Sequence, residues 1–203
     1  MIITTLRDAI DNIWPMLVIF MVVLISIRVA YMRGSKKDFV FYKEVMNLIF
    51  ILYLLLLFEL VTNTGSDPGG LNLIPFTEMF RHSLNSELFF YNVVGNILVF
   101  LPFGYFVAGY VKSKSVGQMF ILSFIASLTI ELIQYKIGRT FDIDDIILNI
   151  AGGILGFLIF IGLSAVKKHL PELFQRDFIY NVMVTVLLVL IVLYYFGIYK
   201  FGW

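Results

Sequence analysis

Residues 91–111 read YNVVGNILVFLPFGYFVAGYV, a run without a single Asp, Glu, Lys or Arg. An α-helix of about 20 apolar residues is long enough to cross the hydrocarbon core of a bilayer. Lipid offers no partner to backbone N–H and C=O groups, so a spanning segment must be a helix or part of a closed barrel. The run lacks the strict alternation of a barrel strand. It therefore predicts a transmembrane helix.

Further apolar runs of similar length flank this one and predict additional spans. The predicted spans cover residues 11–32, 44–62, 91–111, 116–135, 145–166 and 179–199. The composition agrees, because 60% of the 203 residues are hydrophobic and 14% are charged, whereas about a quarter of a soluble domain is charged. The predicted fold class is all-α: a polytopic transmembrane helical bundle of about six spans, forming a single transmembrane domain over residues 1–203.

Cysteine is absent from the sequence, and the net charge is +1. The lack of cysteine excludes disulfides, cysteine-ligated zinc and iron–sulfur clusters. A dispersed, balanced charge is not the basic patch of a nucleic-acid-binding protein. We therefore expect no nucleic-acid partner and no cofactor, with a divalent cation as the one exception that the residues suggest.

The distribution of Lys and Arg predicts how the chain crosses the membrane. Ten of the 15 Lys and Arg residues lie in one set of alternating connections, and five lie in the opposite set together with the two termini. Positively charged residues concentrate in cytoplasmic loops. The sequence therefore places both termini and the loops 63–90 and 136–144 on the extracytoplasmic side. Within the longer loop we expect a short interfacial helix from Thr77 to Leu84.

Polar residues at membrane depth are costly, so each requires an explanation. They lie near one end of the middle four spans: Glu59, Asn92, Asn96, Glu131, Gln134, Asp145 and Asn149. Residues three or four positions apart share a helix face, and spans of alternating direction bring these faces to the same depth on the predicted outer side. Hydrogen bonds between helices would explain the asparagines. Glu131 could form a salt bridge with Arg139 or Lys136, or act as a general base.

The connection before the fifth span reads GRTFDIDD over residues 138–145. Its carboxylates, Asp142, Asp144 and Asp145, indicate either a solvated loop or a divalent-cation site. Asp144 could also be the N-cap of the following helix, whose dipole favours the negative charge of Asp145. Arg139 could bind a carboxylate or phosphate in bidentate fashion, or it could neutralise the aspartates.

Small residues in the fifth span predict close helix packing. Gly152 and Gly156 are four residues apart and form a face that another helix can approach closely. Pro102 in the third span predicts a kink, because proline lacks an N–H group and frees a carbonyl.

The sequence also contains three blocks at defined positions. They are NLIPF at residues 72–76, NILVFLPFG at residues 96–104, and a set made of Glu131, Gln134, Gly138, Arg139, Asp142, Asp145, Asn149, Gly152 and Gly153. In order and spacing these blocks resemble the VanZ-like family of bacterial membrane proteins over about residues 44–166. The resemblance implies a four-helix core, to which the first and last spans are additions.

The same resemblance implies a cellular setting. It points to the cell membrane of a Gram-positive-type bacterium and to action close to the cell wall or its lipid-linked precursors. The family is linked to resistance against glycopeptide antibiotics, teicoplanin in particular. The resemblance brings no established reaction and no catalytic residues.

One function that the sequence supports is a non-enzymatic envelope protein at the outer leaflet. It would be surrounded by membrane lipids and would bind a lipid-linked cell-wall precursor or a glycopeptide antibiotic, with Phe76 and Phe141 beside the acyl chain. Its expected ligand-binding residues are Asn72, Pro75, Phe76, Asn92, Asn96, Gln134, Arg139, Asp142, Asp145 and Asn149.

Two other functions stay open. A membrane hydrolase or transferase would act on a lipid-phosphate or peptidoglycan precursor, with Glu131 as its catalytic base. A divalent cation would then bind to metal ligands at Asp142, Asp144 and Asp145. A lipid or small-molecule transporter would use intramembrane carboxylates for proton coupling.

Overall fold

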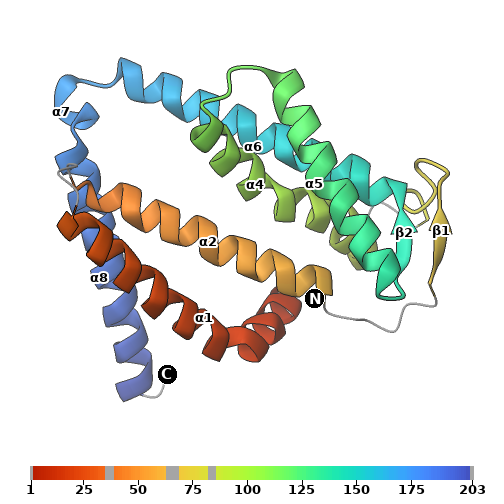
Figure 1. Ribbon diagram of the computed structural model, residues 1–203, viewed down its shortest axis with the longest axis horizontal. Helices are drawn as coiled ribbons and strands as arrows, with labels where there is room; N and C mark the ends of the chain where they lie inside the picture. The colour runs from red at the N-terminus through yellow and green to blue at the C-terminus, as the bar shows by residue number, and fades with distance from the viewer. Residues whose placement is uncertain (1, 35–38, 63–68, 82–85, 202–203) are drawn as a thin grey trace.

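A computed structural model describes residues 2–34, 39–62, 69–81 and 86–201 of the chain (Figure 1). Within these ranges, six helices are long and apolar enough to cross a membrane. They are α1 (Ile2–Gly34), α2 (Phe41–Thr62), the continuous segment of α3 (Glu87–Phe89), η1 (Phe90–Val94) and α4 (Gly95–Val111), α5 (Val116–Lys136), α6 (Ile143–His169) and α8 (Asp177–Phe201). A short helix, α7 (Glu172–Gln175), joins α6 to α8. The predicted spans are confirmed, and the protein is an all-α, multi-pass bundle.

The closest packing in the bundle is between α4 and α6, and glycines make it possible. A Cβ atom at Gly152 would overlap the carbonyl oxygen of Ile97, and a Cβ atom at Gly156 would overlap that of Leu101. The two backbones are therefore in direct contact, as small residues allow for helices in membranes. The prediction of close packing at these two glycines is confirmed.

Two strands of three residues each close one end of the bundle. β1 (Gly70–Asn72) follows α2, and β2 (Thr140–Asp142) joins α5 to α6. They pair in parallel, with Leu71 opposite Phe141, beside the end of α5 and the start of α6 (Figure 1). The loop after α2 is thus tied to the α5–α6 connection, although 70 residues separate Asn72 from Asp142.

The helix expected from Thr77 to Leu84 is wrong for the part of this segment that the structure describes. Residues 75–81 form turns, and residues 82–84 lie outside the described ranges. Phe76 has a positive φ of 69°, a left-handed conformation that does not continue a right-handed helix. The N–H groups of the next residues also bond to a carboxylate of α6 instead of to preceding carbonyls.

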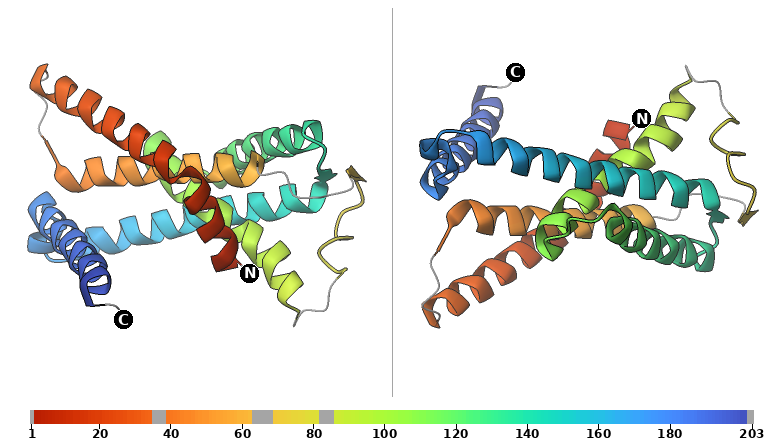
Figure 2. Two further views of the ribbon diagram at one scale, coloured as in Figure 1. Left: turned by 90° about the horizontal axis from the view of Figure 1, so that it is seen from below. Right: turned by 90° about the horizontal axis from the view of Figure 1, so that it is seen from above.

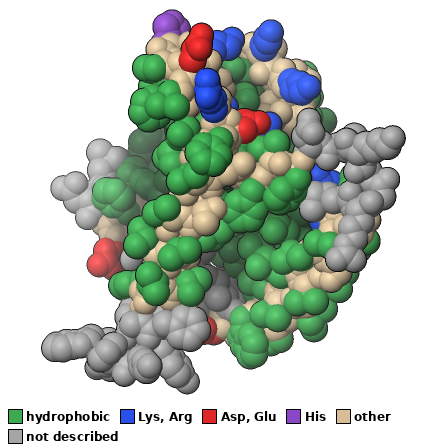
Figure 3. Space-filling view, turned by 90° about the vertical axis from the view of Figure 1, so that its left-hand side faces the viewer, with side chains coloured by type: hydrophobic (Ala, Val, Ile, Leu, Met, Phe, Trp, Pro, Cys, Tyr) green, Lys and Arg blue, Asp and Glu red, His purple; other side chains and the backbone are tan. Residues whose placement is uncertain are grey.

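α1 and α8 lie at the periphery of the bundle (Figure 2). Arg28 of α1 forms a bidentate ion pair with Glu44 of α2, with both N···O distances at 2.6 Å. Lys43 of α2 pairs with Asp177 of α8 at 3.1 Å. Figure 3 shows the side of the molecule that lies at the left of Figure 1. Lys and Arg side chains gather near the top of this side, above a largely hydrophobic surface. Polar contacts at one end thus attach both helices to α2.

Candidate functional site

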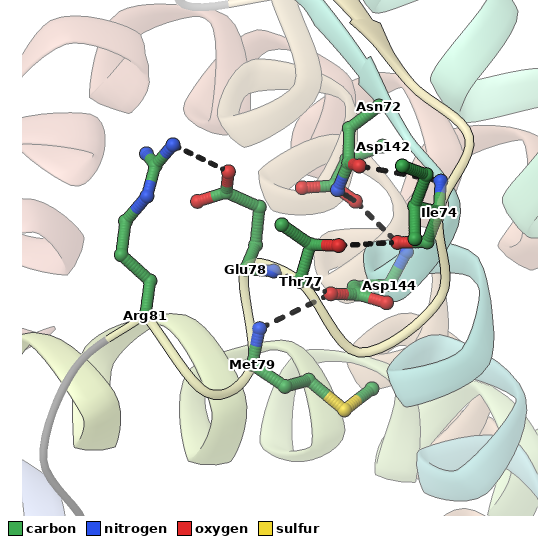
Figure 4. Close-up of polar contacts among 8 residues, drawn as sticks. All are labelled: Asn72, Ile74, Thr77, Glu78, Met79, Arg81, Asp142 and Asp144. Atoms are coloured by element: carbon green, nitrogen blue, oxygen red, sulfur yellow. Dashed lines mark hydrogen bonds and ion pairs between the residues drawn. The ribbon is translucent and has the colours of Figure 1, made fainter.

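Many of the residues predicted to form a site gather at the end of the bundle that the β1–β2 pair closes. Asn72 of β1 donates from Nδ2 to Oδ1 of Asp142 on β2 at 2.9 Å (Figure 4). The same oxygen accepts the backbone N–H of Asp144 at 2.8 Å, which makes Asp142 the N-cap of α6. The prediction that Asp144 caps this helix is therefore wrong, because Asp144 already lies in the first helical turn.

The carboxyl group of Asp142 lies just outside the spans in a partly buried position. Burial raises the pKa of Asp142 above its ordinary value, and the charges of Asp144 and Glu78 act in the same direction. Hydrogen bonds from Asn72 and from the Asp144 N–H oppose this rise. Asp142 therefore retains a proton more readily than an exposed aspartate.

Asp144 is only 1% exposed, and its carboxylate holds the loop that follows β1. Oδ1 accepts the backbone N–H of Phe76 at 2.5 Å, and Oδ2 accepts those of Glu78 at 2.8 Å and Met79 at 3.1 Å. Figure 4 shows the contact of this carboxylate with the loop. Pro75 and Phe76, both predicted to bind ligand, are exposed on the same loop.

Glu131, near the end of α5, is also 1% exposed. Its Oε2 accepts the backbone N–H of Asp142 at 2.9 Å. The side-chain amide of Gln134 donates to Oε1 of Glu131 at 3.0 Å and accepts from the Arg139 guanidinium at 2.7 Å, in the amide orientation that satisfies both neighbours. Gln134 thus lies between Glu131 and Arg139, where the sequence suggested a direct salt bridge. Lys136, the alternative partner, is exposed.

The predicted asparagines have different environments. Asn96 of α4 donates from its side chain to Asp145 of α6, and Asn149 of α6 donates to the hydroxyl of Ser127 on α5 at 3.0 Å. For these two residues the interhelical hydrogen bonds are confirmed. Asn92 lies in η1, partly buried, and its side chain makes no hydrogen bond to any residue that the structure describes.

α5 also contains a line of buried polar side chains that was not predicted from the sequence. Ser123 and Ser127 are 0% exposed and precede Glu131 at intervals of four residues, so the three share one helix face. The hydroxyl of Ser123 has no hydrogen-bond partner among the described residues. The four-residue spacing of Ser123, Ser127 and Glu131 is the feature of the sequence from which this buried polar face could have been predicted. The polar face therefore extends about two helical turns inward from Glu131.

The three aspartates that were considered as metal ligands have separate partners. Asp142 bonds to Asn72, Asp144 bonds to the loop after β1, and Asp145 bonds to Asn96. Across the described part of the chain, no three His, Cys, Asp or Glu side chains are grouped so that they could hold a metal ion. The geometry therefore gives the divalent-cation alternative no support.

Comparison with known proteins agrees with the resemblance seen in the sequence blocks. The sequence model of the VanZ/LLP1 family matches residues 13–167. The chain is 31% identical to Protein VanZ of Enterococcus faecium over 153 residues, which cover 73% of this chain and 86% of that protein. No solved structure matches the chain. Since the family match covers most of the sequence, including every element of the site described above, the protein belongs to the VanZ/LLP1 family.

Proposed function

We propose that this protein is a non-enzymatic binding protein of the bacterial cell envelope. It holds the anionic head of an amphiphilic ligand at Arg139, on the outer side of the membrane. The ligand is a lipid-linked cell-wall precursor or a glycopeptide antibiotic that carries an acyl chain. Binding of the antibiotic would give resistance of the teicoplanin type.

The placement of Arg139 carries this proposal. Arg139 is partly buried just after α5, and within the described ranges its side chain makes one hydrogen bond, to Gln134. A guanidinium group has five N–H donors, so several remain for a ligand. Carboxylates and phosphates both accept the bidentate hydrogen bonds of arginine, and either could be the anionic head.

An apolar surface lies beside this cation and suits the chain of an amphiphile. Gly70, the first residue of β1, pairs with Thr140, the residue after Arg139, and the exposed Leu71 follows it on the strand. The loop after β1 leaves this strand at Asn72, which pairs with Asp142. Leu73 and Phe76 on that loop are exposed. A positive group beside exposed apolar side chains favours a ligand with a charged head and a hydrocarbon tail.

The bonding of Glu131 favours binding over catalysis. Both of its oxygens accept hydrogen bonds from the chain itself, one from the Asp142 N–H and one from the Gln134 amide. A carboxylate that is engaged in this way positions Gln134, and Gln134 in turn positions Arg139. A general base instead needs an oxygen directed at its substrate.

Teicoplanin susceptibility in a sensitive Gram-positive host tests the proposal. The comparison includes an empty vector, the wild type and Arg139→Lys, with expression measured for each. We expect the wild type to protect and Arg139→Lys to lose most of the protection. Lysine keeps the charge but cannot form the bidentate pair, and losing one hydrogen bond to a charged group costs about 1.5–3 kcal/mol, roughly a tenfold or greater loss of affinity.

The matched control is Lys136→Arg, at an exposed position on the last turn of α5. It changes the same two residue types in the opposite direction and should leave protection unchanged. Full protection by Arg139→Lys would refute the site. Absence of protection from a well-expressed wild type would refute teicoplanin as the ligand.

A further inference from the structure

The loop after β1 presents an unusual set of apolar side chains. Leu73, Ile74, Phe76 and Phe80 lie within eight residues, and each is between 53% and 70% exposed. They lie in turns and irregular backbone and not in a spanning helix. Contiguous exposed apolar side chains on a loop mark a surface that contacts another apolar phase.

The attachment of this loop fixes its depth. Asp144 is the second residue of α6, and the N–H groups of Phe76, Glu78 and Met79 lie within 3.1 Å of its carboxylate. The loop therefore lies level with the first turn of a membrane-spanning helix, where hydrocarbon gives way to headgroups. Glu78 and Arg81 are on the same loop and form an ion pair at 2.8 Å. Their two charges therefore neutralise each other at this depth.

The conformation of the loop depends on Asp144. Phe76 has a left-handed backbone, with φ at 69°, which is uncommon for a bulky residue and persists only where the surroundings impose it. The Phe76 N–H donates to Asp144 itself. Since this carboxylate is fully buried and bonds to three N–H groups of the loop, it determines the direction in which the apolar side chains point.

We propose that residues 73–80 are an interfacial anchor whose apolar side chains insert among the phospholipid acyl chains of the adjacent leaflet, and that Asp144 is the positioning residue that holds the anchor in place. By the distribution of Lys and Arg, this leaflet is the outer one. The inference concerns bilayer lipid and holds whether or not Arg139 binds a glycopeptide.

Tryptophan fluorescence of the full chain in nanodiscs tests the insertion. The two native tryptophans, Trp14 and Trp203, are replaced by phenylalanine, and a single tryptophan is introduced as Ile74→Trp or Phe80→Trp. The nanodiscs contain phosphatidylcholine that is unmodified or brominated near the glycerol end of one acyl chain. We expect the brominated lipid to quench both variants strongly and aqueous iodide to quench them weakly.

Two reference positions calibrate the result. Leu132→Trp is exposed on the membrane-spanning part of α5 and should be quenched by the brominated lipid. Lys114→Trp lies in the exposed α4–α5 connection and should be quenched by iodide. The proposal is overturned if Ile74→Trp and Phe80→Trp respond to iodide as Lys114→Trp does.

Asp144→Asn in the Ile74→Trp background tests the positioning role. An amide replaces one of the two carboxylate oxygens with an NH2 group, which cannot accept from the N–H groups of the loop, so quenching by the brominated lipid should fall and quenching by iodide should rise. Asp177→Asn, which alters a carboxylate on α8 that bonds to Lys43, should change neither. An unchanged Ile74→Trp signal in Asp144→Asn would refute the role of Asp144.

A folding control separates loss of the anchor from loss of the bundle. Asp144→Asn combined with Leu132→Trp should keep its lipid quenching if the bundle is intact. If that signal is lost, Met79→Pro provides a second test, because it removes one N–H donor to Asp144 and leaves the buried carboxylate in place. Lipid quenching of Ile74→Trp that survives Met79→Pro in full would also count against the positioning role.

Discussion

At the scale of single residues, the two oxygens of Glu131 connect the interior of α5 to the site. One accepts the Asp142 N–H at the end of β2, and the other accepts the Gln134 amide, which in turn bonds to Arg139. Each of these contacts pairs a donor with an acceptor, and Glu131 is almost fully buried. Removal of one acceptor should therefore leave a buried donor without a partner.

Glu131→Gln tests this expectation. Glutamine offers one oxygen and one NH2 group, so either the Asp142 N–H or the Gln134 amide would face a second donor. If Gln134 turned over to compensate, its NH2 group would face Arg139 instead. A buried unsatisfied group costs about 1–3 kcal/mol, which should appear as a lower thermal unfolding midpoint in detergent.

Glu172→Gln is the matched control, because Glu172 is exposed at the start of α7. Its unfolding midpoint should equal that of the wild type. If Glu131→Gln unfolded at the same temperature as Glu172→Gln, the hydrogen-bonded chain from Glu131 to Arg139 would be contradicted.

At the scale of elements, the contact between α4 and α6 sets the geometry on which the site depends. The two helices approach until glycine Cα atoms of α6 meet backbone carbonyls of α4. In a membrane this approach gains van der Waals contact and interhelical hydrogen bonds, since lipid removes the hydrophobic drive for association. The same contact brings Asn96 of α4 to Asp145 of α6.

Gly152→Ala should separate these helices. The added Cβ atom would overlap the carbonyl oxygen of Ile97, and overpacking typically costs about 1–3 kcal/mol. Gly162→Ala is the control on the same helix, because nothing lies within 4 Å of its Cβ position. It should be neutral or gain up to about 1 kcal/mol from helix propensity. Thermal unfolding in one detergent compares the two, and equal midpoints would argue against direct backbone contact at Gly152.

At the scale of the whole molecule, the two ends of the bundle carry different polar groups. One end contains the β1–β2 pair with Asp142, Asp144 and Asp145, and the other contains the ion pairs Arg28–Glu44 and Lys43–Asp177. The distribution of Lys and Arg predicts that the first end faces outward. This orientation decides whether Arg139 can meet an extracellular ligand.

Thiol labelling tests the orientation cleanly, because the chain has no native cysteine. Ile137→Cys lies at the exposed end of α5 beside the site, and Ser115→Cys lies in the exposed α4–α5 connection. Neither substitution alters the charge. A membrane-impermeant maleimide should label Ile137→Cys on intact cells and Ser115→Cys only after the membrane is opened. The reverse pattern would show that the protein is inserted the other way round.

Apolar length predicted the spans correctly because the thickness of hydrocarbon is a local requirement that each segment meets alone. Helix periodicity likewise predicted the hydrogen bonds of Asn96 and Asn149 to neighbouring helices, which the structure confirms. The spacing of Gly152 and Gly156 predicted close packing for the same reason. Each of these features is visible within one segment of the chain.

The role of each aspartate was decided only by the tertiary structure. The sequence suggested that Asp144 caps α6, whereas Asp142 is the cap and Asp144 holds the loop. The Phe76 N–H that Asp144 accepts lies 68 residues away in the chain. Every residue except proline has such a backbone donor, so no residue type or spacing marks which donor a buried carboxylate will meet. The sequence by itself determined where the polar groups lie along each helix, and packing determined which partners they contact, because partners far apart in the chain meet only after the helices have assembled.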